Sequence, residues 1–195
     1  MNIRKFAIVA LLSFIAVTAQ AQIQIFTTFL SGANENPPNA SPGTGNATLT
    51  LNLTLHTFQL VVNFTGLTGT TTASHIHAPV LVPGGNAGVA TQTPSFTGFP
   101  LGVTSGVYNS PVFDMTLAST WNPAYVTANG GTPAGAEAAF VSAVQNGASY
   151  LNIHSSTFGG GEIRGFLVPE PATTTLLAVA GGGLALAAWR RRKQR

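Results

Sequence analysis

Two histidines separated by a single residue have the clearest potential for chemistry in this chain. His75 and His77 flank Ile76 in residues 73–78, a segment whose composition favours a β-strand. Because side chains alternate along a strand, both imidazoles are predicted on one face, with Cα atoms about 6.5–7 Å apart. That spacing suits two ligands of one zinc or copper ion.

Two later segments supply further candidate ligands. His154 ends a predicted strand over residues 149–154, and Glu162 and Arg164 share one face of the next predicted strand, 162–168. If these strands pair as a hairpin, His154 and Glu162 come close together. The candidate metal ligands are therefore His75, His77, His154 and Glu162. The alternative is that these polar groups form a hydrogen-bonded network that holds loops in place without an ion.

Arg164 is also the only basic residue between the two ends of the chain. The acids of the same region are Glu35, Asp114, Glu137, Glu162 and Glu170, so one base and five acids give a net charge of −4. A globular nucleic-acid-binding protein carries a basic patch on its folded body, and this body has none. A lone arginine is expected to be paired. Glu162 and Glu35 are the candidate partners, and Glu162–Arg164 is the predicted structural ion pair because strand alternation puts both on one face.

The elements that must position these residues are predicted to be mostly strands. Apolar and polar residues alternate over residues 47–55 and again over 58–64, which indicates an antiparallel hairpin. Further strands are predicted at 23–30, 73–78, 88–93, 112–118, 149–154 and 162–168. One helix is predicted over residues 132–146, with Thr132 as N-cap and Pro133 at the first helical position. The pattern favours an all-β antiparallel sandwich with one short helix.

The N-terminal segment has the features of a secretory signal peptide. Arg4 and Lys5 precede an apolar run over residues 6–17, and Ala19-Gln20-Ala21 provides a small-x-small cleavage site. The run is shorter than the roughly 20 apolar residues of a membrane-spanning helix. We therefore expect signal peptidase to remove residues 1–21, the alternative being an uncleaved anchor.

The C-terminal segment combines three features in a fixed order. Pro169-Glu170-Pro171 precedes an uncharged run over residues 172–189, long enough to span a membrane. The basic tail 190–195 follows, and it contains Arg190, Arg191 and Arg192. This order resembles the PEP-CTERM sorting signal of Gram-negative bacteria. The resemblance implies an inner-membrane-anchored precursor, removal of the tail by an exosortase, and delivery to the cell surface or the medium. An ordinary single-pass anchor is the alternative.

Three segments of the body resemble the CHRD domain, which is named from the extracellular protein chordin. They are FLSGANENPPNASPGTGNATLTL (29–51), SHIHAPVLVPGGNAG (74–88) and ASYLNIHSSTFGGGEIRGFL (148–167). The resemblance implies an immunoglobulin-like or superoxide-dismutase-like β-sandwich over residues 22–168. It implies little about activity.

No catalytic-triad signature, phosphate-binding loop or zinc finger occurs in the sequence. The leading hypothesis is a non-enzymatic cell-surface or extracellular-matrix protein, associated with exopolysaccharide or with copies of itself. The alternative is a metal-binding module like copper/zinc superoxide dismutase, in which an H-x-H strand also supplies copper ligands. The chain departs from that family because it has no cysteine, and because the body between its two basic ends has only one arginine, Arg164, for a cationic substrate channel. A non-catalytic metal-binding module is a third possibility.

Overall fold

The computed structural model describes residues 23–170. The predicted signal peptide (1–21), Pro171, the predicted membrane span (172–189) and the basic tail (190–195) lie outside the described residues. Within residues 23–170, no helix is both long enough and apolar enough to cross a membrane.

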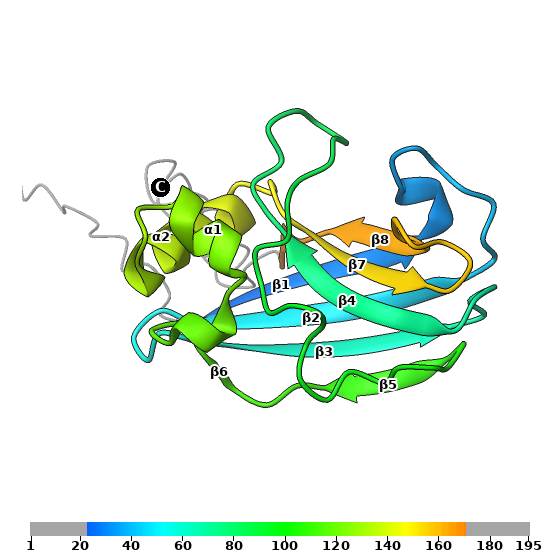
Figure 1. Ribbon diagram of the computed structural model, residues 1–195, viewed down its shortest axis with the longest axis horizontal. Helices are drawn as coiled ribbons and strands as arrows, with labels where there is room; N and C mark the ends of the chain where they lie inside the picture. The colour runs from blue at the N-terminus through cyan, green and yellow to red at the C-terminus, as the bar shows by residue number, and fades with distance from the viewer. Residues whose placement is uncertain (1–22, 171–195) are drawn as a thin grey trace, which may run out of the picture.

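Nine strands form one sheet, which curls so that its two halves enclose the core (Figure 1). Its main path runs β4-β7-β8-β1-β2-β3-β5, while β6 pairs with β3 and β9 pairs with β1. All the strand pairs are antiparallel, and the predicted all-β fold is confirmed. The strands are β1 (Ile23–Ser31), β2 (Thr44–Asn52), β3 (Thr57–Thr65), β4 (Thr71–His77), β5 (Gly106–Asn109), β6 (Phe113–Asp114), β7 (Tyr150–Ser155), β8 (Ile163–Phe166) and β9 (Val168–Pro169).

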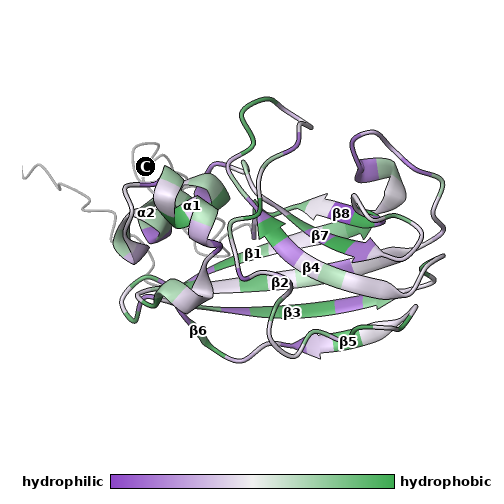
Figure 2. Ribbon diagram, viewed as in Figure 1, coloured by the Kyte–Doolittle hydropathy of each residue, from purple (hydrophilic) through white to green (hydrophobic). Residues whose placement is uncertain are grey.

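The β2–β3 hairpin shows why the sheet has one dry face and one wet face. Leu49 lies opposite Leu60, and Leu51 lies opposite Phe58. All four side chains are buried, while the residues between them are half-buried or exposed. Figure 2 shows this alternation of apolar and polar positions along the strands. The inward residues join a single hydrophobic core that also includes Ile76 of β4 and Ile153 of β7.

Two α-helices cover one end of the curled sheet (Figure 1). α2 (Pro133–Gln145) begins as predicted, because the Thr132 hydroxyl accepts a hydrogen bond of 3.1 Å from Gly135 N. Its apolar stripe faces the core, where the ring centroid of Phe140 lies 5.7 Å from that of Phe58. The preceding helix α1 (Pro123–Ala128) was not predicted. Two short 3-10 helices, η1 (Gly32–Asn34) and η2 (Ala118–Thr120), lie in the connections.

Two predicted strands are largely absent. Residues 88–93 form only isolated bridges, one to β4 and one to Trp121, so neighbouring residues pair in different directions and no ladder develops. Residues 112–118 contribute only the two residues of β6. There the Asp114 carboxylate accepts a hydrogen bond of 2.8 Å from Thr116 N, which turns the chain away from β3.

We predict that a chain ending at Glu170 keeps the folded domain. Its last residue still donates the sheet hydrogen bond from Glu170 N to Ile25 O, so β9 is retained. Thermal unfolding followed by circular dichroism should show one cooperative transition. A shorter control that ends at Leu167 lacks β9 and should unfold at a lower temperature. Aggregation or non-cooperative melting of the longer form would contradict a self-contained domain.

Candidate metal centre

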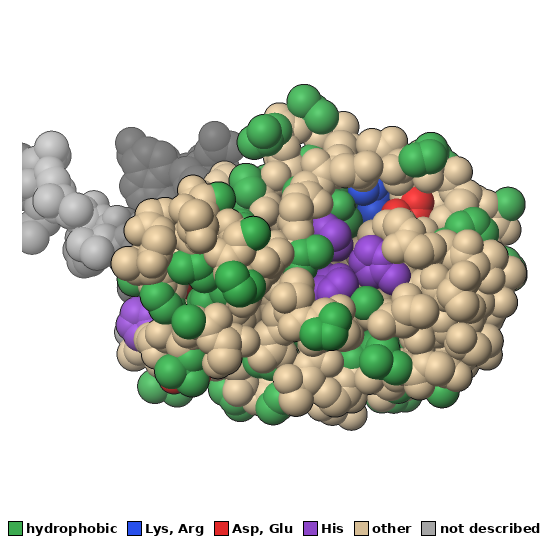
Figure 3. All heavy atoms as spheres, in the orientation of Figure 1, with side chains coloured by type: hydrophobic (Ala, Val, Ile, Leu, Met, Phe, Trp, Pro, Cys, Tyr) green, Lys and Arg blue, Asp and Glu red, His purple; other side chains and the backbone are tan. Residues whose placement is uncertain are grey.

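Three histidines from two neighbouring strands gather on one face of the sheet. His75 and His77 lie on β4, and His154 lies on β7 opposite Ala73 of β4. Alternation puts residues 73, 75 and 77 on the same face, so the pairing brings His154 to the other two histidines. The three ring centroids are 5.2–5.9 Å apart. Figure 3 shows the three rings together at the surface.

A backbone carbonyl fixes the orientation and the tautomer of each ring. His75 Nε2–H donates to Pro94 O at 2.7 Å, and His77 Nδ1–H donates to Ala87 O at 2.9 Å. His154 Nδ1–H donates to Gly159 O at 3.0 Å. A carbonyl oxygen only accepts, so the ring nitrogen that faces it must carry the proton. The other nitrogen of each neutral ring then holds a free lone pair.

The nitrogens with these free lone pairs are buried and have no protein partner. They are Nδ1 of His75, Nε2 of His77 and Nε2 of His154. One ligand nitrogen from each ring lies within 4.8 Å of those of the other two. Buried polar atoms in folded proteins nearly always have a hydrogen-bond partner. Three converging acceptors without a donor, each ring held from behind by a carbonyl, are typical of metal-ligating histidines.

The surroundings keep all three imidazoles neutral. Burial lowers the pKa of His75 and of His154, although the hydrogen bond from each ring to a carbonyl works against that shift. Burial lowers the pKa of His77 to about 4, and the neighbouring His154, His75 and Arg164 contribute further lowering. Because a metal ion binds only the unprotonated nitrogen, the site is ready for a cation at neutral pH.

Next to the histidines, the buried side chain of Arg164 ties several segments together. Its guanidinium donates to the carbonyl oxygens of Asn34, Gly84 and Gly85, and to Asn86 Oδ1 at 2.7 Å. It also lies 4.6 Å from the ring centroid of Tyr150. Figure 3 shows this basic side chain, the only one in residues 23–170, next to the histidines.

The ring of Tyr150 connects the arginine to the metal-ligand candidates. It stacks on His77 with centroids 4.8 Å apart and only 5° between the ring planes. Its hydroxyl accepts a hydrogen bond of 3.2 Å from Ala87 N, in the residue whose carbonyl holds His77. Arg164, Tyr150 and His77 therefore form one continuous stack, and the loop that covers His77 is held by all three.

The ion partner of Arg164 is Glu35 and not the predicted Glu162. Arg164 Nε lies 3.9 Å from Glu35 Oε2, and both side chains are buried. Burial raises the pKa of Glu35 to about 7, while Arg164 and a hydrogen bond with Asn152 act in the opposite direction. Strand alternation failed as a guide here because β8 begins only at Ile163, so Glu162 precedes the strand.

Glu162 is also not part of the histidine group, although it was predicted as a fourth metal ligand. Its carboxylate accepts hydrogen bonds from Ser41 Oγ at 2.6 Å, from Gly69 N at 3.2 Å and from Thr68 N. Burial acts to raise the pKa of Glu162, but hydrogen bonds from Ser155 and these groups leave it below its usual range. These hydrogen bonds anchor the turn before β4 and occupy both oxygens of the carboxylate.

Sequence reasoning missed the groups that orient the histidines. Tyr150, which stacks on His77, shares a face of β7 with His154 at four-residue spacing, so the strand period itself could have identified it. The carbonyls of Ala87, Pro94 and Gly159 leave no signal in the sequence, because every residue has a carbonyl.

Comparison with known proteins shows the family to which the chain belongs. The family model described as the CHRD domain matches residues 26–167. The model described as the PEP-CTERM protein-sorting motif matches residues 167–193, which include Pro169, Glu170, Pro171, Arg190, Arg191 and Arg192. No curated protein and no solved structure matches the chain.

We predict that Arg164→Ala lowers the free energy of unfolding by about 3–5 kcal/mol, the usual cost of breaking a buried pair. The substitution removes donors to two loops and leaves Glu35 without its cation. Arg164→Lys is the matched variant. It keeps the charge but cannot reach all the acceptors of a planar guanidinium, so it should recover only part of the loss. Chemical denaturation measures both changes, and an unchanged midpoint for Arg164→Ala would refute this role.

Proposed function

Because the chain belongs to the CHRD domain family and ends in a PEP-CTERM motif, we propose that it is a surface-displayed protein whose CHRD domain binds one transition-metal ion. The PEP-CTERM motif implies processing by an exosortase, with export and a membrane-anchored precursor before surface display. The metal ligands in this proposal are His75, His77 and His154. Glu162 is not among them.

The observation that supports the metal site is the set of three buried nitrogens without partners. A purely structural histidine network would pair each ring on both sides, because an unsatisfied buried acceptor costs about 1–3 kcal/mol. Here only one side of each ring has a partner, and the open sides converge. A cation that accepts all three lone pairs removes this cost in one step.

The donor set narrows the class of metal. Imidazole nitrogen suits zinc and copper, and within the divalent series Cu²⁺ binds such donors more tightly than Zn²⁺. Three protein ligands leave a coordination position for water or another small molecule, as in open zinc sites. Zinc and copper are therefore the ions to test first.

We propose that this site binds metal without superoxide dismutation. An enzyme of that kind profits from exposed cations that steer its anionic substrate. Arg164 is the only basic residue of the described domain, its side chain is 1% exposed, and its donors are taken up by backbone carbonyls, Asn86 and the neighbouring Glu35. No steering field is available from that arrangement.

We also propose that the processed protein stays at the cell surface in the extracellular matrix. The outer face of β2 and β3 is rich in threonine and asparagine, β1 adds the exposed apolar side chains of Ile25 and Phe29, and the three strands carry no charged residue. An uncharged surface of this kind favours contact with uncharged matrix components or with further copies of the chain.

The metal proposal predicts one ion per chain and a dependence on three of the four histidines. We expect Zn²⁺ or Cu²⁺ to raise the unfolding temperature of the chelator-treated full-length protein in detergent, and EDTA to reverse the rise. His75→Ala, His77→Ala and His154→Ala should each weaken binding at least as much as the roughly 10–100-fold loss caused by removing an outer-shell partner. Isothermal titration calorimetry and elemental analysis measure affinity and stoichiometry.

The fourth histidine provides a matched control. His56 lies outside the cluster and pairs with Glu137 at 2.8 Å, so His56→Ala should leave metal affinity unchanged. Because the pKa values of the three clustered histidines are lowered, metal binding should weaken at a lower pH than at a site made of ordinary histidines with a pKa of about 6.5. It should be lost as the pH falls toward 4, the value to which the pKa of His77 is lowered. Equal binding by all four variants would contradict the site.

The sorting proposal has a separate test. Protein recovered from the outer surface of its native cells should have lost residues beyond the Pro169–Pro171 tripeptide, because the exosortase removes the tail. Intact-mass spectrometry distinguishes the processed form from the precursor. A surface-recovered mass that still includes Trp189 would indicate a permanent anchor.

A further inference from the structure

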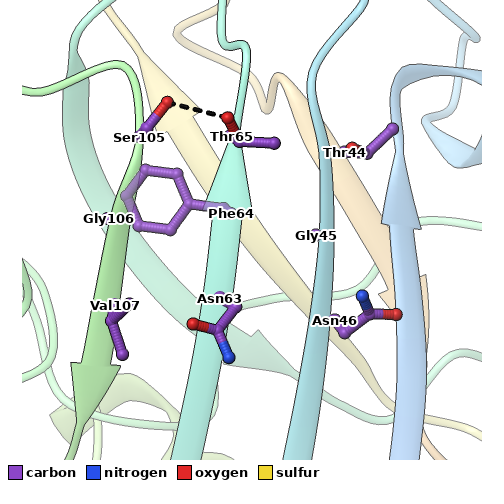
Figure 4. A pocket seen from close by; sticks show the side chains of 9 residues that line it. All are labelled: Thr44, Gly45, Asn46, Asn63, Phe64, Thr65, Ser105, Gly106 and Val107. Carbon is purple, nitrogen blue, oxygen red and sulfur yellow. Dashed lines mark hydrogen bonds between the residues drawn. The ribbon is translucent and has the colours of Figure 1, made fainter.

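A groove on the outer face of the β2–β3–β5 region has the chemistry of a second binding site. Its volume is about 510 Å³. Figure 4 shows its lining, with polar side chains on neighbouring strands and a hydroxyl pair at one end. The side chains used below are Thr44, Asn46, Asn63, Thr65, Ser105 and Val107. The metal centre lies elsewhere in the sheet, on β4 and β7.

The strand register arranges the central residues of this groove in one row. Phe29 lies opposite Asn46, Asn46 lies opposite Asn63, and Asn63 lies opposite Val107. Residues directly opposite each other in antiparallel strands share a face. The row therefore crosses four neighbouring strands, a span of about 14 Å at the usual strand spacing. Val107 lines the groove and is 61% exposed, while Phe29 lies on β1 next to the groove, outside its lining, and is 54% exposed.

The two amides at the centre of the row are free to bind something else. Within residues 23–170, the side chains of Asn46 and Asn63 form no hydrogen bond with another protein group. Each amide offers two N–H donors and one carbonyl acceptor. At the end of the groove, the hydroxyls of Thr65 and Ser105 are 3.0 Å apart and are held in place by each other. The groove thus presents donors and acceptors side by side.

The groove is also uncharged. The charged residues of the described domain are Glu35, Asp114, Glu137, Glu162, Arg164 and Glu170, and none of them lines it. An ionic ligand would gain nothing from pairing here. A ligand that fits has many hydroxyls for the amides and an apolar flat side for an aromatic ring. Sugar rings combine both features, with hydroxyls around the edge and C–H groups on the face.

We infer that this groove, together with the exposed Phe29 beside it, binds a neutral polysaccharide chain laid across the strands along the row from Phe29 to Val107. The amides of Asn46 and Asn63 bind ring hydroxyls, and Phe29 packs against the C–H face of a neighbouring sugar. The inference rests on the proposed surface display for access to such a polymer. It is independent of the metal centre.

A second copy of the chain is the competing occupant of this face. Stacking two such faces would bury four asparagine amides away from water. Each buried amide that finds no hydrogen-bond partner would make the free energy of association less favourable. A hydroxyl-rich chain satisfies the amides without that penalty, which is why the observations favour a polysaccharide.

The test uses the full-length protein in detergent, immobilised for surface plasmon resonance. The probes are dextran, laminarin and hydroxyethyl cellulose as neutral glycans, and alginate as an anionic one. We expect at least one neutral glycan to bind, with little dependence on salt. The double variant Asn46→Ala/Asn63→Ala should lose about tenfold or more in affinity, as expected for two lost hydrogen-bonding groups. Phe29→Ala should weaken binding similarly.

Gln59→Ala is the matched control, because this exposed amide lies on the same face of β3 but outside the groove. It should leave glycan affinity unchanged, and EDTA should do the same. The inference is overturned if no neutral glycan binds, if only alginate binds and salt abolishes that binding, or if Gln59→Ala equals the double variant. Concentration-dependent dimers in sedimentation that vanish in Phe29→Ala would also overturn it, in favour of a second copy. Failure of surface display appears only in cell fractionation, so the two results are distinguishable.

Discussion

The end of the domain that carries the three histidines depends on the hydrogen bonds of the buried Arg164 guanidinium. A charge in the protein interior is tolerated only when its hydrogen-bonding capacity is used, and here backbone carbonyls from two separate loops use it. The guanidinium thereby fixes the loop after β1 and the loop after β4 against the same strand, β8. These loops are rich in glycine, proline and asparagine, and the large apolar side chains of Leu81 and Val82 in the second loop are exposed and do not pack in the core. The hydrogen bonds from Arg164 therefore hold these loops in place.

Arg164 also influences the orientation of the histidines, because side chains packed against it contact them. Tyr150 lies between the guanidinium and His77, and its hydroxyl holds the residue that orients His77. The segment between β4 and β5 then supplies the carbonyls for two of the three imidazoles. Ring orientation and tautomer are therefore set by backbone atoms of a covering segment, while the strands set only the positions of the Cα atoms. The geometry of the three candidate ligands is therefore a property of strand and loop together.

The strands and the histidine pair were predictable because both follow from a period of two. The alternation over β2 and β3 specifies which face is buried, and the same rule places His75 and His77 side by side. The pairing of β7 with β8 was also confirmed. The contacts that could not be predicted involve backbone atoms, or depend on the residue at which a strand begins. Arg164 binds mainly carbonyls, which leave no trace in composition, and Glu162 misses the strand by one residue. The edge strand β5 has only four residues, too few for a pattern.

The short strand β9 places the sorting tripeptide at the margin of the folded sheet. Pro169 pairs with Phe26, and Glu170 N donates to Ile25 O, so two of the three residues of the tripeptide already belong to the sheet edge. A processing enzyme that binds this stretch in an extended form has to compete with β1 for the same backbone groups. Access is then governed by how often the final strand frays, an equilibrium that is local and much cheaper than global unfolding. Fraying of this two-residue pairing would free the tripeptide without unfolding the rest of the domain.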